Sequence, residues 1–464
     1  MGVSSDGHLN VPELLFYGLF SLQHRGQEGA GIAWRRGGSI TAHRSAGMVA
    51  NALSRYLGES NPSTGGIGHV RYSTAGASRV EEAQPILVTC SKGEVALAHN
   101  GNLSNARELS SRLVAEGSIF QSTTDSEILL HLLARSPRRD FREALAESLA
   151  ALEGAWCFLV MHGESIYAVR DPLGFRPLVI GRRDGTVYVA SETCALDIFQ
   201  AAEVREVMPG EMVEVRGSRV ESTFLAPVAP GAASSPPRAH CIFELIYFAR
   251  PDSEVFGHSV HMARKRMGAM LAQDDPSPGD LVIPVPDSGN SASLGYAGRS
   301  GIALDQGLTR NHYMGRTFIQ PTAVLRELGV RMKLHPVREA IAGRRVTVID
   351  DSLVRGTTSR QMVRLLREAG AREVHLRLSS PPLRHPCFFG IDIPTREELI
   401  SNRMEPDEVA RHIGADTVRF LPLESLRACV SSPERFCYAC FSGEYPCRVP
   451  ARGAGRAREP AAAG

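Results

Sequence analysis

The sequence of 464 residues has no long hydrophobic run and no marked excess of either charge. The most apolar early stretch, residues 11–22, carries Glu13 and is too short to cross a bilayer. A formal net charge of +2 gives no reason to expect a nucleic-acid partner. The chain does not open with a charged segment, an apolar core and a cleavage site, so we expect a cytoplasmic protein with no membrane partner.

Nine cysteines are present, and in a reducing cytoplasm disulfide bonds are rare. Clustered cysteines in that setting more often hold a metal or carry out chemistry. Cys437 and Cys440 form a C-x2-C pair whose thiolates converge across a tight turn. Two ligands are too few, so partners must come from elsewhere. Cys241 and Cys387 both lie beside aromatic and proline-containing turns, which would form a dry pocket suited to sulfur, although buried unpaired cysteines are common. Zinc and an iron–sulfur cluster fit four thiolates equally well.

The composition changes once along the chain, at residues 226–239, which are rich in proline, alanine and serine and poor in large apolar side chains. This stretch is typical of a linker between two domains. We therefore predict one domain over residues 1–225 and a second over residues 240–448. Residues 449–464 lack hydrophobic periodicity and are predicted to be a disordered tail.

The two predicted domains differ in their local patterns. In the first, short β-rich runs alternate with turns, and helices are predicted near residues 11–22, 105–116 and 125–134, which together indicate an α+β unit. In the second, strands alternate with helices, for example a strand at 346–349 and a helix at 358–369. That order predicts an α/β unit with a parallel, doubly wound sheet.

Residues 346–358 carry the strongest functional signal. Four β-branched residues, 346–349, form a predicted central strand, and Asp350 and Asp351 follow at its carboxyl end, where open α/β sheets bind ligands. The next loop contains Gly356, Thr357 and Thr358 and opens a helix, so backbone N–H groups converge on a site suited to a phosphate monoester. Two carboxylates beside a phosphate need hydroxyls or a divalent cation. The alternative is a solvated acidic strand end followed by an ordinary helix cap.

Two further segments could serve the same ligand. The strand "LVIPVPDSGN" ends in polar residues that include Ser288, although any strand-to-helix turn could look like this. Between the two strands, an arginine-rich stretch with little periodicity contains Arg316, Arg331 and Lys333. Each of these cations could contact phosphate, or could belong to a solvated helix.

These segments resemble the type I phosphoribosyltransferases, which bind 5-phosphoribosyl-1-diphosphate (PRPP). The resemblance implies that Asp350 and Asp351 hold the ribose hydroxyls and, with Ser288, help to place Mg²⁺. It further implies that PRPP is contacted by a larger set: Ser352, Val354, Arg355, Gly356, Thr357, Thr358, Arg316 and Lys333.

The amino-terminal segments "SLQHRGQEGAGI", "GIGHVRYSTAG", "ALAHNGNLSN" and "STTDSEILLHLL" resemble the αββα glutaminase domain of N-terminal-nucleophile amidotransferases. On this resemblance Arg71 pairs with the carboxylate of glutamine and Asp125 with its ammonium group. Asn100 and the N–H of Gly101 form the oxyanion hole for amide hydrolysis. Taken singly, each residue could be a turn residue or a helix cap.

The segments around the four cysteines resemble the iron–sulfur class of the glutamine PRPP amidotransferase, or amidophosphoribosyltransferase, family. The resemblance implies that Cys241, Cys387, Cys437 and Cys440 ligate a [4Fe–4S] cluster with a structural role. It implies that ammonia from glutamine displaces pyrophosphate from PRPP, giving 5-phosphoribosylamine in the first step of purine biosynthesis. A homotetramer inhibited by purine nucleotides is also implied.

The family mechanism needs a cysteine at the first residue, whose own α-amino group acts as the base. The sequence has Met1 before Gly2 and Val3 at that place, so we expect no glutamine hydrolysis by the chain as printed. Three explanations remain open: a start codon placed too far downstream, a replaced cysteine, or natural use of free ammonia. We favour the first, because the other glutamine-site residues are all present.

Three other functions fit part of the pattern. The phosphoribosyltransferase fold also serves proteins that only sense PRPP, but such a regulator is expected to carry a basic face or a nucleic-acid-binding module. An amidotransferase that makes a different product is not expected to carry the 346–358 segment. The third alternative is a phosphoribosyltransferase that uses only free ammonia.

Overall fold

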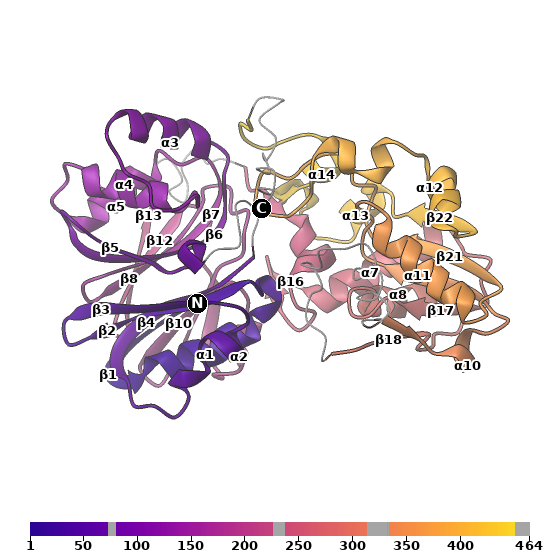
Figure 1. The fold of residues 1–464 in the computed structure, drawn as a ribbon, viewed down its shortest axis with the longest axis horizontal. Coiled ribbons are helices and arrows are strands. Elements are labelled where there is room, and N and C mark those ends of the chain that lie inside the picture. Colours follow the sequence, from indigo (N-terminus) through magenta and orange to yellow (C-terminus); the bar gives the residue numbers. More distant parts are fainter. Residues whose placement is uncertain (73–79, 226–236, 313–331, 333, 451–464) are drawn as a thin grey trace, which may run out of the picture.

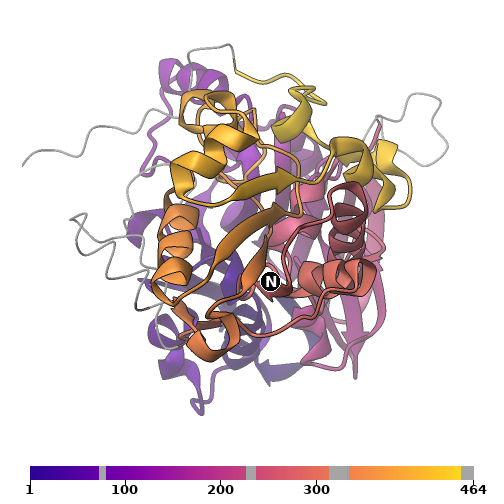
Figure 2. The ribbon, with the colours of Figure 1, turned by 90° about the vertical axis from the view of Figure 1, so that its right-hand side faces the viewer.

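The computed structural model shows two halves side by side (Figure 1). Turned by 90°, the carboxyl-terminal half lies in front of the amino-terminal half (Figure 2). The described residues are 1–72, 80–225, 237–312, 332 and 334–450. Most of the predicted linker and nearly all of the predicted tail lie outside them.

The amino-terminal half contains two antiparallel sheets. In spatial order the first consists of β11 (Ala202–Glu206), β9 (Val179–Arg183), β10 (Thr186–Ala190), β1 (Gly2–Asn10), β4 (Pro62–Arg71), β2 (Gly29–Arg36) and β3 (Ser39–Ala46). The second consists of β13 (Arg219–Phe224), β12 (Glu211–Arg216), β8 (Ser165–Arg170), β7 (Gly154–His162), β6 (Gly93–Leu103) and β5 (Ile86–Cys90). The side chains between the sheets form a buried apolar core that includes Ile67 and Leu159.

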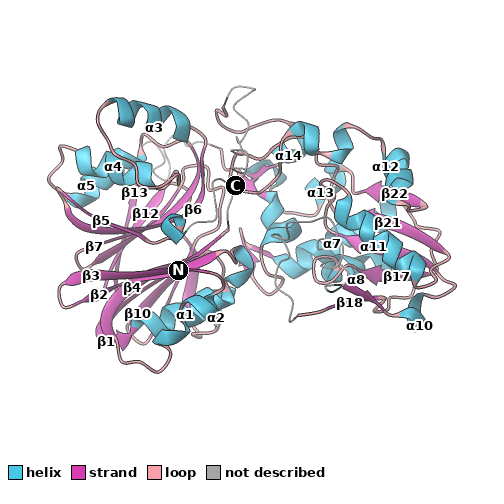
Figure 3. Cartoon of the chain, viewed as in Figure 1, coloured by secondary structure: helices cyan, strands magenta, loops and turns pink. Residues whose placement is uncertain are grey.

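Helices cover the outer faces of both sheets (Figure 3). The first sheet is covered by α1 (Val11–Ser21), α2 (Val49–Ala52) and α6 (Cys194–Asp197), and the second by α3 (Ala106–Ala115), α4 (Glu127–Arg135) and α5 (Phe141–Leu149). The predicted αββα architecture is confirmed, and the three predicted helices correspond to α1, α3 and α4. The periodicity explains α1, because Leu15, Leu19 and the following Leu22 are all buried against the first sheet.

The carboxyl-terminal half is built on a parallel sheet with β17 (Leu281–Pro284), β20 (Arg345–Asp350), β21 (Glu373–Leu378) and β22 (Thr417–Phe420) in that order. Helices α7 (Val260–Asp274) and α8 (Asn290–Ser300) pack on one face, and α11 (Thr357–Glu368) and α12 (Pro406–Ile413) on the other. Apolar side chains of β17 and β20 enter both cores, which is the pattern of a strand buried on both faces. The predicted doubly wound α/β fold is confirmed.

Smaller elements complete this half. They are β14 (His240–Cys241), a π-helix (Glu244–Phe248), β15 (Glu254–Val255), β16 (His258–Ser259), β18 (Leu308–Arg310), β19 (Leu334–Pro336), α10 (Arg338–Ile341), α13 (Leu423–Ala428), β23 (Phe436–Cys437) and α14 (Ala439–Ser442). The last strand of the amino-terminal half ends at Phe224 and β14 begins at His240, so the proposed domain boundary falls between elements. Within the described ranges, no helix has both the length and the apolar character needed to cross a membrane.

Candidate functional site

The residues predicted to bind glutamine come from three segments of the amino-terminal half. Arg71 is the last residue of β4, Asn100 and Gly101 lie in β6, and Asp125 precedes α4. Strand β6 is held by β7 over its whole carboxyl-terminal part, with Asn100 opposite Cys157. Regular strand pairing thus fixes the backbone on which the predicted oxyanion donors lie.

In the part of the chain that the structure describes, Asn100 carries an unpaired buried donor, and Gly101 has a backbone position that only glycine can occupy. The Asn100 side-chain nitrogen is buried and, among the described residues, has no hydrogen-bond partner. Leaving such a donor unpaired costs about 1–3 kcal/mol, a cost that a bound acceptor would remove. Gly101 has φ of +152°, and a Cβ there would lie 2.1 Å from the carbonyl oxygen of Ala155. Only glycine therefore fits this backbone position.

Asp125 is oriented by its neighbours. One carboxylate oxygen accepts a hydrogen bond from the Leu103 N–H at 2.7 Å, and the other lies 3.4 Å from Nδ1 of His99. Burial raises the pKa of Asp125, but His99 and these hydrogen bonds lower it by more, so its pKa lies below the usual value. Asp125 therefore remains a carboxylate at neutral pH, as an ammonium-binding group requires.

Arg71 is buried and connected to the Asp125 segment. Its Nη2 lies 3.7 Å from a carboxylate oxygen of Glu82. The other oxygen of Glu82 accepts hydrogen bonds from the N–H and the hydroxyl of Thr123, two residues before Asp125. The two predicted glutamine-binding residues, which are 54 positions apart in the sequence, are thus joined through one carboxylate.

The amino group of Met1 lies beside β4, the strand that ends at Arg71, and the Met1 side chain packs against α1 near Gly18. The α-amino group of Met1 is buried and donates a hydrogen bond to the Gly68 carbonyl at 2.7 Å. Burial lowers the pKa of this amine to about 5, so the amine is neutral at pH 7. Burial and the nearby amine lower the pKa of His69, the residue after Gly68, to about 3. The His69 ring contacts the His99 carbonyl at 3.0 Å. A neutral amine at this place can accept a proton.

The acidic pair at the end of β20 is joined to the neighbouring strand. The Ser288 hydroxyl donates to Oδ1 of Asp350 at 2.9 Å, and the Asp351 N–H donates to the same oxygen at 2.9 Å. The Ser352 hydroxyl donates to Asp351. The three predicted Mg²⁺ residues therefore meet, because β17 and β20 are parallel neighbours whose carboxyl ends lie at one edge of the sheet.

Both carboxylates of this pair have raised pKa values. For Asp350 the causes are burial and then the charge of Asp351, and for Asp351 burial again dominates. Two carboxylates this close in a buried place oppose each other's ionisation. A cation placed between them would remove that opposition.

The predicted phosphate loop joins β20 to α11. Gly356 caps the helix with φ of +79°, where a Cβ would lie 2.9 Å from Ile400, and the predicted residues Thr357 and Thr358 begin the helix. Its first N–H groups have no partners within the helix and point toward the loop. Val354 is held by its carbonyl, which accepts from the Ile400 N–H at 2.9 Å.

Among the described residues, no predicted phosphate-binding cation is seen to contact this loop through its charged group. The Arg355 guanidinium is 43% exposed and forms an ion pair with Glu398 at 2.6 Å, so it would have to exchange that partner to reach a phosphate. Arg316, Arg331 and Lys333 lie outside the described residues.

The four predicted cluster cysteines line one cavity, although they come from three separate segments. Cys241 and Cys437 are directly opposite each other in the parallel pair of β14 and β23. Cys440 lies in α14, and the sulfur of Cys387 accepts a hydrogen bond from the Phe389 N–H at 3.3 Å. The other walls are mostly apolar and include three aromatic side chains, Phe175, Phe243 and Phe389, and the ring of Tyr445.

This cavity is lined mostly by apolar groups, and the thiols in it disfavour one another's ionisation. Burial raises the pKa of the Cys241 thiol to about 12, and the charge of Cys387 adds to the effect. Burial likewise raises the pKa values of Cys437 and Cys440. In the described part of the chain, no three His, Cys, Asp or Glu side chains are close enough to hold a single metal ion.

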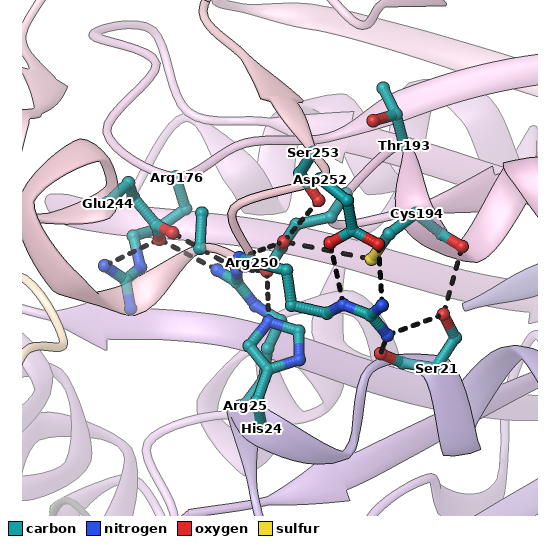
Figure 4. Close-up of polar contacts among 12 residues, drawn as sticks. Ser21, His24, Arg25, Arg176, Thr193, Cys194, Glu244, Arg250, Asp252 and Ser253 are labelled. Carbon is teal, nitrogen blue, oxygen red and sulfur yellow. Dashed lines mark hydrogen bonds and ion pairs between the residues drawn. The ribbon is translucent and has the colours of Figure 1, made fainter. Parts of the chain in front are cut away.

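The residue patterns did not reveal a buried ionic cluster between the two halves (Figure 4). Glu192 and Glu244 are both completely buried and contact Arg25, and Arg176 lies 3.0 Å from Glu244. The only signal was that Arg25 and Glu244 fall within segments that resemble the family. Their pairing was not predictable, because 219 positions separate them.

Comparison with known proteins agrees with this arrangement. Residues 69–197 match the family described as a glutamine amidotransferase domain. The chain is 46% identical over 449 residues to the amidophosphoribosyltransferase of Bacillus subtilis, an alignment that covers 96% of this chain and 93% of that protein. It is 44% identical over 458 residues to the amidophosphoribosyltransferase of Methanocaldococcus jannaschii, with 97% of each covered.

The likeness extends to three dimensions. The solved structure of glutamine phosphoribosylpyrophosphate (PRPP) amidotransferase from B. subtilis, complexed with ADP and GMP, matches with a TM-score of 0.89 and 44% sequence identity. The match covers 98% of each chain. Because identity, coverage and fold agree along both halves, the chain belongs to the amidophosphoribosyltransferase family.

Proposed function

We propose that this chain is an enzyme that forms 5-phosphoribosylamine from PRPP and ammonia, the first step of purine biosynthesis. The observation that carries the proposal is the acidic pair of the half-buried Asp350 and the buried Asp351, which is joined to Ser288 and followed by a helix that opens on Gly356. Such a pair is electrostatically incomplete without a cation. PRPP with Mg²⁺ supplies both the cation and a phosphate for the helix start.

In this reaction the nitrogen of ammonia forms a bond to C1 of the ribose while the bond from C1 to the pyrophosphate oxygen breaks. Mg²⁺, when bound, would neutralise charge on the departing pyrophosphate. The protein binds and orients the sugar: Asp350 and Asp351 accept hydrogen bonds from the ribose hydroxyls, and the loop at residues 352–358 donates to the 5-phosphate. The ammonium product then loses one proton, which leaves the amine.

We propose that the amino-terminal half supplies the ammonia by hydrolysing glutamine when a cysteine occupies position 1. Arg71 and Asp125 would hold the carboxylate and ammonium groups of glutamine. Asn100 and the N–H of Gly101 would donate to the oxyanion, and the neutral α-amino group would accept the thiol proton. With Met1 in that position, we expect the printed chain to use ammonia alone.

We propose that Cys241, Cys387, Cys437 and Cys440 hold a structural [4Fe–4S] cluster. Four soft thiolates around one aromatic cavity, with a backbone N–H directed at the sulfur of Cys387, suit such a cluster. Elemental analysis of anaerobically purified protein tests this: we expect iron and inorganic sulfide, both reduced in Cys437→Ser. Zinc without iron would contradict it.

A nucleotide-inhibited homotetramer is proposed from the family alone. The B. subtilis relative was solved with ADP and GMP, so we expect purine nucleotides to inhibit this chain as well. Inhibition assays with ADP and GMP, and the mass of the protein in solution, test the two parts separately.

The main experiment measures phosphoribosylamine with ammonium and with glutamine as separate nitrogen sources. We expect the printed chain to form product from ammonium only, and the Met1→Cys chain with a free amino terminus to use both. No product from either source, together with intact PRPP binding, would instead indicate a PRPP-sensing protein.

A further inference from the structure

One carboxylate of the carboxyl-terminal half reaches into the amino-terminal half. Glu244 opens the π-helix and its side chain is completely buried. Its Oε1 lies 2.8 Å from Nη2 of Arg25 and 3.0 Å from Nη1 of Arg176, and both arginines belong to the amino-terminal half. Figure 4 shows Glu244 next to these two guanidinium groups.

The contact with Arg25 leads to the predicted glutamine anchor. Arg25 precedes Gly26, whose backbone is pressed against that of Arg71: a Cβ on Gly26 would lie 2.4 Å from the Arg71 carbonyl carbon. Gln23 also donates from its side chain to the Gly26 carbonyl at 2.5 Å. A shift of Arg25 would therefore be transmitted to the backbone of Arg71, because no side chain separates the two segments.

The contact with Arg176 leads to the predicted oxyanion donor. Nη2 of Arg176 donates to the Gly390 carbonyl at 3.3 Å. Gly390 has φ of +94°, and a Cβ there would lie 3.2 Å from the carbonyl carbon of Gly101. The next residue, Asn102, donates from its side chain to the Phe388 carbonyl at 2.9 Å. The segment that follows Cys387 thus packs against the strand that carries Gly101.

The π-helix is itself firmly held from the carboxyl-terminal half. The buried Arg264 donates to the carbonyls of Leu245 and Ala249 at 2.9 and 2.7 Å. The ring of Phe248 lies 4.6 Å from the guanidinium carbon of Arg25 and 5.0 Å from that of Arg176. Glu244 therefore has little freedom to move without its two arginines.

We propose that Glu244 is a positioning residue for glutamine hydrolysis, setting Arg71 through Arg25 and Gly101 through Arg176. The inference rests on the proposed function, because it assumes that Arg71 and Gly101 serve glutamine. It makes the glutamine site incomplete without the carboxyl-terminal half. The two contacts of Glu244 should have different kinetic effects. The contact with Arg25 acts on Arg71, which is expected to bind substrate, and the contact with Arg176 acts on Gly101, which is expected to stabilise the transition state.

The test uses the full chain with Met1→Cys as parent and measures kcat and KM for glutamine alongside the rate with ammonium. For Glu244→Gln we expect kcat/KM for glutamine to fall about tenfold or more, with the ammonium rate unchanged within about twofold. For Arg25→Lys we expect mainly a higher KM for glutamine. For Arg176→Lys we expect mainly a lower kcat at nearly constant KM.

The matched control is Glu211→Gln. Glu211 is also a buried carboxylate of the chain, but it pairs with Arg205 and Ser222 at the far strands β11 and β13. We expect its loss to leave the ratio of glutamine to ammonium rates unchanged. Thermal unfolding of every variant reports on folding separately from the kinetic ratio.

Three outcomes would contradict the inference. Equal loss of both rates in Glu244→Gln would indicate only a structural contact between the halves. Unchanged glutamine kinetics in a folded Glu244→Gln chain would exclude positioning, although the proposed function would stand. A parent that forms product from ammonium but never from glutamine would contradict the proposed glutamine site, and the inference with it.

Discussion

The protein contains two pairs of largely buried carboxylates, and their charges are compensated in different ways. Glu192 and Glu244, between the two halves, are completely buried and contact arginines. Asp350 and Asp351, at the end of β20, have hydroxyls and a backbone N–H as their hydrogen-bond partners. The first pair is neutralised by the chain itself, whereas the second has hydrogen bonds but little compensating charge.

The pKa values express this difference. Burial raises the pKa of Glu192, but Arg25 and His24 lower it by more, so its pKa lies far below the usual value. Burial raises the pKa of both Asp350 and Asp351, and the charge of Asp351 raises that of Asp350 further. A buried acid with arginine partners serves the fold, whereas the strand-end pair, which has no ion pair with an arginine among the described residues and only a minor contribution from the charge of Arg264, is prepared for a ligand.

The largest expected effect comes from removing the charge of the strand-end pair. In the double variant Asp350→Asn, Asp351→Asn we expect ammonium-dependent product formation to fall about 1,000-fold, because ribose and cation binding are both lost. The free energy of unfolding should stay constant or rise, since the mutual repulsion disappears. Steady-state kinetics and urea unfolding measure the two parts, and a strongly destabilised variant would refute the contrast.

Removing a charge from the buried ionic cluster between the two halves should lower the stability of the fold. Glu192→Gln removes one of the two carboxylates that contact the buried Arg25 and leaves Glu244 as the other, so we expect the free energy of unfolding to fall by about 3 kcal/mol. The exposed pair of Glu424 and Arg427 offers a control, because Glu424→Gln should change little. Chemical unfolding at pH 7 gives both values, and equal effects would show that burial does not distinguish the pairs.

Adding PRPP with Mg²⁺ should stabilise the folded protein through Asp350 and Asp351 and not through Glu192 and Glu244. PRPP with Mg²⁺ at about 100 times its dissociation constant should add about 2.7 kcal/mol to the free energy of unfolding. The increase should persist in Glu192→Gln and disappear in the Asp350→Asn, Asp351→Asn chain. Thermal unfolding with and without the ligand measures it, and a ligand effect retained by the double variant would place PRPP elsewhere.

The smallest expected effect is the pH dependence of stability without ligand. The folded pKa values of Asp350 and Asp351 lie above the unfolded value of about 3.9, so their contribution should decrease as pH rises from about 4 through the raised pKa values. The folded pKa of Glu192 lies below its unfolded value, so its contribution is present above about pH 4.3 and is lost as pH falls.

Urea unfolding between pH 3 and 8 separates these contributions. The double asparagine variant should lose the decrease at rising pH, and Glu192→Gln should lose part of the decrease at falling pH. The same slope in the parent and in both variants would show that neither pair controls it.

Much of the fold was predictable because its signals are local. The apolar spacing in residues 11–22 predicted α1, and the strand, acidic pair and glycine-containing loop at 346–358 predicted β20 and α11. The spacing of Cys437 and Cys440 predicted a metal-binding pair, whereas the full set of four and its [4Fe–4S] cluster were predicted from the resemblance; the four cysteines do line one cavity, and the cluster remains a prediction. The roles of Arg71, Asn100 and Asp125 remain predictions that the geometry supports.

The unpredicted part consists of contacts between distant segments. Neither Glu244 nor Gly390 has a local pattern that points to Arg176 or Gly101, because a single buried charge or glycine has no periodicity. The predicted cations Arg316 and Lys333 lie outside the described residues and stay predictions.

The sequence by itself determined the order of strands and helices along the chain, such as β20 followed by the glycine-containing loop and α11. These follow from interactions between residues within a few positions of one another, such as helix periodicity, strand alternation and turn chemistry. Only the tertiary structure decided which buried carboxylates receive arginine partners and which do not. Charge compensation depends on distance in space, and residues 219 positions apart meet only when both halves have folded and packed together.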